Sequence, residues 1–296
     1  MREKQDMTEL LQYVITGVTV GSIYGLIALG FVLVYNSSHV INFAQGDLQM
    51  IGGMMAVAVL TAGLPLPIAV VLGTLGGAGV GFLLYKAAIQ PAGNAGPLPL
   101  VVITLGAALV IRGAAESVWG RGYYSLPAFS GDEAIHVMGV TVMPQSLWVL
   151  GLTAAVVIVL TRFFDATKTG KAILATSIDP DAATLMGIDT RRMKLLCFGL
   201  GGFLASVAGV AIAPIAFTYS TVGLMLGLKG FVAAVLGGLG NFKGAVLGGL
   251  ILGITETMMS GYGASDYKDA VAFLLILVIL VFMPRGLFGA SGAERV

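Results

Sequence analysis

Four ionisable side chains lie within long apolar runs of this 296-residue sequence, where a charge is costly unless it is paired or reaches water. They are Arg112, Glu116, Lys229 and Glu256. Arg112 and Glu116 are four residues apart, so a helix would place them on one face, where they could pair. Two chemical roles are open for the set. It could form a charged, externally accessible vestibule for the ammonium and carboxylate of a zwitterion, or a structural ion pair with side chains that snorkel to lipid headgroups.

A second group of polar residues precedes a short apolar run. Residues 48–62 alone are too short to cross a bilayer core of about 30 Å, so residues 41–47 are expected to enter the membrane as well. This segment carries Asn42, Gln45 and Asp47. Irregular backbone at membrane depth is tolerated where protein buries it or where it lines a cavity, and broken helices are typical of transporter sites. We therefore interpret these residues as substrate-pathway candidates; a polar interfacial cap on a short helix is the alternative.

Catalysis finds little support in the sequence. The two histidines, His39 and His136, belong to no H-E-x-x-H motif, and no G-x-S-x-G motif is present. The Gly170-Lys171 pair lacks the first glycine and the following hydroxyl of a Walker A loop. We predict no ATP site, metal or other cofactor in this chain, and an intramembrane enzyme is disfavoured.

A stand-alone channel or ion-coupled carrier stays open as a different class of function. In such a protein Asp47, Arg112 and Glu256 could be the coupling groups.

The composition indicates that the chain is a membrane protein. Hydrophobic residues make up 57% of the chain and charged residues only 10%, against about 25% charged in soluble domains. Long apolar runs exclude an outer-membrane barrel, whose strands alternate apolar and polar residues. A net charge of +1 gives no electrostatic support for binding nucleic acid. The expected fold is therefore an all-α, polytopic integral membrane protein with one domain over residues 1–296.

The apolar runs predict about eight or nine transmembrane segments, some of them short or broken. The candidates are residues 10–35, 39–62, 67–89, 98–119, 146–164, 195–217, 223–240, 244–260 and 269–283. Residues 162–194 hold six of the 16 basic residues, whereas residues 120–145 hold one. Because basic loops stay in the cytoplasm, the first loop is expected inside and the second outside. The C-terminus then lies inside and the N-terminus outside.

Glycine spacing predicts close helix contacts, because lipid gives helices no hydrophobic reason to associate and small residues allow backbones to approach. The chain has 43 glycines, many of them four residues apart and hence on one helix face. The stripes are Gly17, Gly21 and Gly25; Gly73, Gly77 and Gly81; Gly240, Gly244 and Gly248; and Gly249 with Gly253. They favour ordinary close packing over helices that slide along a pathway.

The basic loop carries local helix signals. Asp179 suits an N-cap, Pro180 suits the first helical position, and Gly187 suits a left-handed residue after the helix end. A second short helix is expected to start near residues 169–170. Small apolar residues on such a helical pair would be poorly placed in water, so the pair is expected to dock into a soluble partner subunit or against the chain's own helix ends.

Four stretches resemble the signatures of branched-chain amino-acid ABC permeases, and the LivH-like branch in particular. They are residues 21–30 together with 41–47, residues 170–188, residues 229–256, and residues 267–288. The resemblance implies a permease subunit that forms half of the translocation pathway of a binding-protein-dependent importer, and not an enzyme. Related permeases of the family import urea or short amides, and nothing in the spans selects the substrate.

The resemblance also implies partners and a place in the cell. The partners are a LivM-like second permease, LivG-like and LivF-like ATPases that hold ATP and magnesium, and a periplasmic protein that delivers leucine, isoleucine or valine. The chain would lie in the bacterial inner membrane, in contact with lipid. Coupling to the ATPases is implied for Gly170, Lys171, Ala172, Ala175, Asp179, Pro180, Ala182, Leu185, Gly187 and Ile188.

Overall fold

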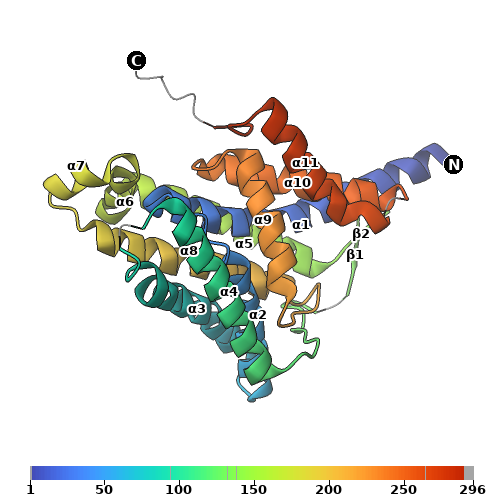
Figure 1. The fold of residues 1–296 in the computed structure, drawn as a ribbon. Coiled ribbons are helices and arrows are strands. Elements are labelled where there is room, and N and C mark those ends of the chain that lie inside the picture. Colours follow the sequence, from blue (N-terminus) through green and yellow to red (C-terminus); the bar gives the residue numbers. More distant parts are fainter. Residues whose placement is uncertain (1, 94, 132, 138, 264, 290–296) are drawn as a thin grey trace.

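The protein is a helical bundle with one small hairpin, seen in a computed structural model that describes residues 2–93, 95–131, 133–137, 139–263 and 265–289 (Figure 1). The helices are α1 (Arg2–Ser38), α2 (Gln45–Thr61), α3 (Leu66–Leu84), α4 (Pro97–Trp119), α5 (Pro144–Ala166), α6 (Lys168–Ile178), α7 (Pro180–Leu185), α8 (Thr190–Ile212), α9 (Val222–Gly237), α10 (Phe242–Gly261) and α11 (Lys268–Phe282). A π-helical turn, η1 (Tyr85–Ile89), extends α3, and a 3-10 turn, η2 (Ser265–Tyr267), precedes α11. Strands β1 (Ile135–Val137) and β2 (Val140–Val142) pair antiparallel.

The predicted fold class, a mostly helical polytopic membrane protein, is confirmed at this level. Within the described ranges, six helices are long and apolar enough to cross a membrane: α1, α3 with η1, α4, α5, α8 and α10. Helices α2, α9 and α11 have 17, 16 and 15 residues and are shorter than a full span. Each of the nine predicted segments overlaps one of these helices, but a total of eight or nine crossings stays a prediction.

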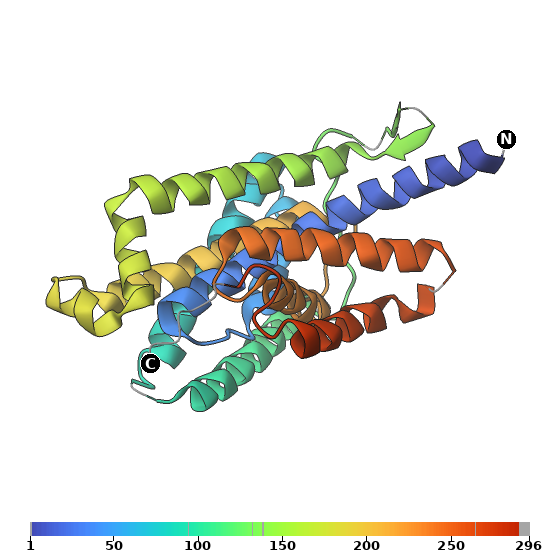
Figure 2. The same cartoon turned by 90° about the horizontal axis from the view of Figure 1, so that it is seen from above.

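The two long loops lie at opposite ends of the bundle. Helices α1, α5, α8 and α10 run along a common direction in both views (Figures 1 and 2). At one end α6 and α7 project from the bundle, and at the other end lie the β1–β2 hairpin and the start of α1. Gln12 of α1 joins the hairpin through two hydrogen bonds of 2.9 Å with the backbone of Thr141. The structure therefore separates residues 162–194 from residues 120–145 by the length of the bundle.

Two predicted segments differ in extent from the helices that they overlap. The second was expected over 39–62 with irregular backbone in 41–47; helix α2 begins at Gln45, and residues 39–44 are non-helical. The sixth was expected over 195–217, but α8 runs from Thr190 to Ile212, because the Asp189 carboxylate accepts the Arg192 N–H at 3.1 Å and caps an earlier start. Residues 213–221 contain Pro214 and form no regular helix.

Helix α1 is the centre of the bundle, and its glycine stripe is an interface. The hydrophobic residues from Ile23 to Val34 are at most 3% exposed. Gly21 lies against the backbone of Gly249 and Leu250 in α10, and Gly253 lies against Gly17 and Gly21. The predicted stripes on α1 and α10 are thus two halves of one contact.

Of the remaining glycine stripes, one lies wholly at a helix interface and one does not. The glycines of α3 pack on the backbones of α2 and α8; Gly73 faces Gly52, and Gly81 faces Phe198. Gly244 packs against Gly237 of α9, but Gly240 is not on a helix. Its φ of 103° places it in the turn between α9 and α10, a region that favours glycine, so its assignment to a helical stripe is wrong.

Gly253→Ala is expected to destabilise the protein by about 2 kcal/mol, because the new Cβ would overlap only backbone atoms of Gly17 and Gly21, so the two helices must separate. The measurement is the denaturation midpoint in mixed dodecyl maltoside and sodium dodecyl sulfate micelles. Gly151→Ala in α5 is the matched control, since nothing lies within 4 Å of its Cβ position. It should be neutral or stabilising through higher helix propensity. Equal effects of the two substitutions would contradict the assignment of this contact.

Candidate functional site

The break before α2 is held by its own polar side chains. The side-chain oxygen Oδ1 of Asn42 accepts the Ala44 N–H at 3.2 Å, and Asn42 Nδ2 donates to Gln45 Oε1 at 3.4 Å. Gln45 Nε2 donates to the carbonyl of Gly201, which lies halfway along α8, at 2.7 Å. Both amide side chains are fully buried. Helix α2 therefore starts at the middle depth of α8, and its irregular lead-in is buried in protein, as such backbone requires.

The start of a second short helix meets the start of α2. Gly223 and Gly227, in the first two turns of α9, face the backbone of Gly46 so closely that a Cβ on either would lie within 3 Å of it. In Figure 1 α9 crosses the long helices steeply and reaches α2. Two helix N-termini, each with a partial positive charge, thus meet inside the bundle. Such half-helix junctions are the pattern in which transporters build their pathways.

Asp47 and Arg112 form an ion pair at this junction. Arg112 Nε donates to Asp47 Oδ1 at 2.7 Å and Nη2 donates to Oδ2 at 3.2 Å. The Asp47 side chain is 1% exposed and that of Arg112 is 18% exposed. The carboxylate lies in the first turn of α2, where it complements the positive helix end. Arg112 therefore ties the peripheral helix α4 to the junction.

Arg112 and Glu116, whose spacing allowed them to pair, do not contact each other through an ion pair. Glu116 instead pairs with Arg121 at 3.1 Å, at the end of α4, where the two side chains are 28% and 84% exposed. Arg112 turns toward α2, where the Asp47 carboxylate is 1% exposed and therefore needs a cationic partner.

Lys229 and Glu256 form a second buried cluster together with Asp269 and Tyr24. Lys229 Nζ lies 2.5 Å from Glu256 Oε1 and 2.7 Å from Asp269 Oδ1. The Tyr24 hydroxyl donates to Glu256 Oε2 at 2.9 Å, and Lys229 Nζ lies 5.6 Å from the centre of the Tyr24 ring. The cluster joins α1, α9, α10 and α11.

The structure thus divides the four predicted vestibule charges into three separate contacts. Arg112 is with Asp47, Glu116 is with Arg121, and Lys229 is with Glu256. The Lys229 and Glu256 side chains are only 7% and 10% exposed. Contact of any of these residues with a substrate stays a prediction.

Asp269 and Tyr24 are members of the cluster that the sequence interpretation missed. Asp269 carried a usable signal, because an acidic residue at the start of a strongly apolar helix calls for a basic partner. Tyr24 carried none that distinguishes it from other buried aromatics. Among the described residues no group of three His, Cys, Asp or Glu side chains is placed to hold a metal ion.

The projecting helical pair has the predicted caps. The Asp179 carboxylate accepts the N–H groups of Asp181 and Ala182 at 3.0 and 2.9 Å, Pro180 opens α7, and Gly187 has a φ of 83°. The start of α6 was expected near residues 169–170 but lies at Lys168, because the Thr167 hydroxyl accepts the Gly170 N–H at 2.9 Å.

The tip of this pair is apolar and unpartnered within the described structure. Ile178, Leu185 and Met186 are 85%, 89% and 84% exposed. Of the residues assigned to coupling by resemblance, Gly170 is buried against Phe163 and Phe164. Ala172, Ala175, Pro180 and Ile188 are half-buried, whereas Lys171, Asp179, Ala182, Leu185 and Gly187 are exposed.

Comparison with known proteins bears on the function of this arrangement. The chain is 33% identical to the high-affinity branched-chain amino acid transport system permease protein LivH of Escherichia coli K12, over 97% of each chain. It is 30% identical to the corresponding permease protein BraD of Pseudomonas aeruginosa, over 97% of this chain and 98% of BraD. Among solved structures, PsaBC from Streptococcus pneumoniae in complex with a Fab has a similar fold, with a TM-score of 0.51 and 17% identity over 94% of this chain and 92% of that chain.

The family model described as branched-chain amino acid transport system, permease component, matches residues 13–280. This match includes both half-helices, both buried ion clusters and the projecting helical pair. The family resemblance stated from the sequence is therefore confirmed, and this chain belongs to the branched-chain amino acid permease family.

Proposed function

We propose that this chain forms half of the translocation pathway of an ATP-driven importer for branched-chain amino acids. One observation carries the proposal: permeases whose names specify branched-chain amino acid transport match 97% of this chain, at 33% and 30% identity. The half-helix junction of α2 and α9 supplies an arrangement suited to a pathway wall.

Seven polar residues are proposed to serve the pathway. Five of them, Asn42, Gln45, Asp47, Lys229 and Glu256, are buried and act by fixing α2, α9 and α10 in place. Arg112 and Glu116 have the largest exposed fractions of the seven, 18% and 28%. These two are the ones able to contact a passing substrate directly.

The proposed orientation places α6 and α7 in the cytoplasm and the β1–β2 hairpin outside the bacterial inner membrane. Six basic residues within 162–194 support this orientation. The exposed apolar tip of α6 and α7 supports a soluble partner, since large exposed apolar patches commonly mark interaction sites. We propose that the tip seats in the LivG-like and LivF-like ATPases, which bind ATP and magnesium. A LivM-like permease and a periplasmic binding protein complete the assembly.

Reconstitution tests this function. The full chain, co-expressed with its genomic partner subunits, is placed in proteoliposomes with ATP inside and the binding protein outside. Uptake of tritiated leucine is expected only when ATP and the binding protein are both present, and valine and isoleucine should compete. Competition by urea or acetamide instead would assign the family's alternative substrates. Flux through the chain alone, without ATP, would identify a carrier or channel.

A further inference from the structure

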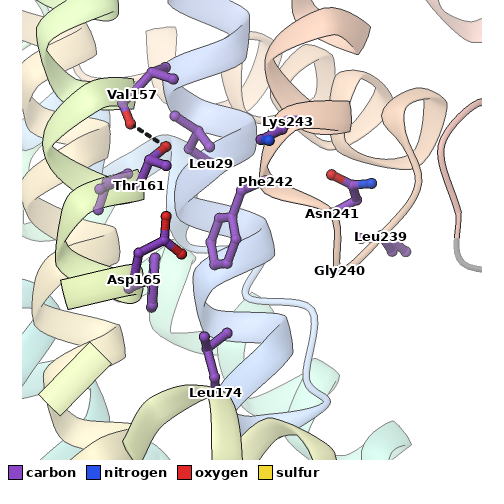
Figure 3. A pocket seen from close by; sticks show the side chains of 12 residues that line it. Leu29, Val157, Thr161, Asp165, Leu174, Leu239, Gly240, Asn241, Phe242 and Lys243 are labelled. Atoms are coloured by element: carbon purple, nitrogen blue, oxygen red, sulfur yellow. Dashed lines mark hydrogen bonds between the residues drawn. The ribbon is translucent and has the colours of Figure 1, made fainter. Parts of the chain in front are cut away.

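A groove of about 520 Å³ opens between α5 and the start of α10, beside α6. Its floor and walls are mainly apolar and include Leu29, Val157, Leu160, Phe164 and Phe242. Figure 3 shows the Phe242 ring between the two walls. The groove is distinct from both buried ion clusters and from the α2–α9 junction, because none of their residues lines it.

Two opposite charges face each other across this apolar space. Asp165 projects from the last turn of α5 and Lys243 from the first turn of α10, on opposite walls (Figure 3). Both side chains belong to exposed residues, and neither forms an ion pair within 4.0 Å with a described residue. The Thr161 hydroxyl, on the α5 wall one turn before Asp165, donates to the Val157 carbonyl at 2.8 Å. The groove therefore offers one free cation and one free anion, judged on the described part of the chain.

The two helix ends add partial charges of the same sign as the free side chain beside each of them. Lys243 lies at the N-terminus of the 20-residue helix α10, whose positive end favours phosphate. Asn241 caps this end by accepting the Gly244 N–H at 3.0 Å. Asp165 lies at the C-terminus of the 23-residue helix α5, whose negative end favours an ammonium group. The two walls therefore suit opposite ends of a zwitterion.

The groove lies at a level along the spanning helices that suits a lipid headgroup. Its polar side chains lie at the last turn of one spanning helix and the first turn of another, at the end of the bundle that carries α6 and α7. In the orientation of the proposed function, on which this step rests, that level is the headgroup region of the inner leaflet. The apolar residues Val157 and Leu29 extend from there toward the bilayer core.

We propose that this groove binds one molecule of phosphatidylethanolamine from the inner leaflet. The lipid phosphate lies against Lys243 and the start of α10, its ammonium group donates to the Asp165 carboxylate, and one acyl chain follows the apolar wall. Phosphatidylglycerol is disfavoured because its headgroup carries no cation for Asp165. Phosphatidylcholine is disfavoured because its trimethylammonium group has no N–H to donate.

Native mass spectrometry of the complete complex tests this inference. The full chain with its partner subunits is delipidated in dodecyl maltoside and titrated with palmitoyl-oleoyl phosphatidylethanolamine, phosphatidylglycerol or phosphatidylcholine. One tightly held phosphatidylethanolamine is expected. Lys243→Gln and Asp165→Asn should each weaken its binding about fivefold. Asp165→Asn should also raise the relative binding of phosphatidylglycerol. Lys86→Gln, at an exposed lysine of η1 outside this groove, is the matched control and should change nothing.

Three results would overturn the inference. They are equal binding of the three lipids, unchanged phosphatidylethanolamine binding in both groove variants, and displacement of the lipid by leucine, which would make the groove a substrate site. The lipid measurement needs no transport. A complex that holds phosphatidylethanolamine through Lys243 and Asp165 but takes up no leucine therefore rejects the proposed function and leaves the lipid site standing.

Discussion

Lys229→Met is expected to destabilise the protein by about 3–5 kcal/mol, the usual cost of removing one partner from a buried ion pair. Lys229 is the cation between Glu256 and Asp269, and its side chain is 7% exposed. Its loss leaves two carboxyl groups near each other with no positive charge from the cluster. The denaturation midpoint in mixed micelles measures the effect, as for the glycine variants.

Two further variants show whether charge or packing causes the loss. Asp269→Asn should cost less than about 1 kcal/mol, because the Asp269 side chain is 43% exposed and Lys229 keeps Glu256. Adding Glu256→Gln to Lys229→Met should recover part of the stability, since the amide oxygen can still accept from Tyr24. A single loss of equal size in Lys229→Met and in the double variant would show that the charge pairing is not the cause.

The sequence predicted correctly those features whose contacts are made between residues close together in the chain. Asp179, Pro180 and Gly187 lie within nine residues, and the cap, the first position and the left-handed end were each predicted because their contacts are made within one short helix. The same reasoning anticipated an irregular stretch ahead of a short helix, and residues 39–44 are non-helical before the 17-residue helix α2 begins at Gln45. Entry of residues 41–47 into the membrane stays a prediction.

Partners far apart in the sequence could not be predicted in this way. The four-residue spacing of Arg112 and Glu116 suggested a pair, but the carboxylate that Arg112 contacts is Asp47, 65 positions away on another helix. Spacing describes one helix face only, and the choice of neighbour depends on how several helices pack. The glycine stripes show the same limit, because they indicated faces that pack closely without indicating that α1 and α10 pack on each other.

The buried ion clusters tie the short helices to the long ones. Helix α4 meets the α2–α9 junction through Arg112, and α11 meets α9 through Asp269. Helices α2, α9 and α11 each lack the length of a full span, so hydrophobic matching with the bilayer alone defines their positions poorly. Charged contacts of defined geometry help to specify those positions, which gives these ionisable groups a structural role.

The double substitution Leu185→Asp, Met186→Asp is expected to reduce ATP-dependent leucine uptake at least about tenfold while leaving the fold intact. Each side chain is more than four-fifths exposed, so neither contributes much to the stability of the chain itself. Burying such a side chain in a partner contributes about 1.5–3 kcal/mol, and a carboxylate in its place must be desolvated. The measurements are uptake in proteoliposomes and the amount of ATPase subunit that co-purifies with the chain.

Two controls separate docking from unfolding and from charge alone. Leu185→Met keeps an apolar side chain and should retain uptake, whereas Leu64→Asp places a carboxylate on an exposed leucine at the opposite end of the bundle and should leave ATPase binding unchanged. The denaturation midpoint of the double variant should stay within about 0.5 kcal/mol of the unmodified protein, because surface substitutions rarely exceed that effect. Full uptake and normal ATPase recovery in the double variant would show that the ATPases do not hold this tip. The basic, capped helical pair would then have to act through its polar face, which includes the exposed cations Lys168 and Lys171 of α6.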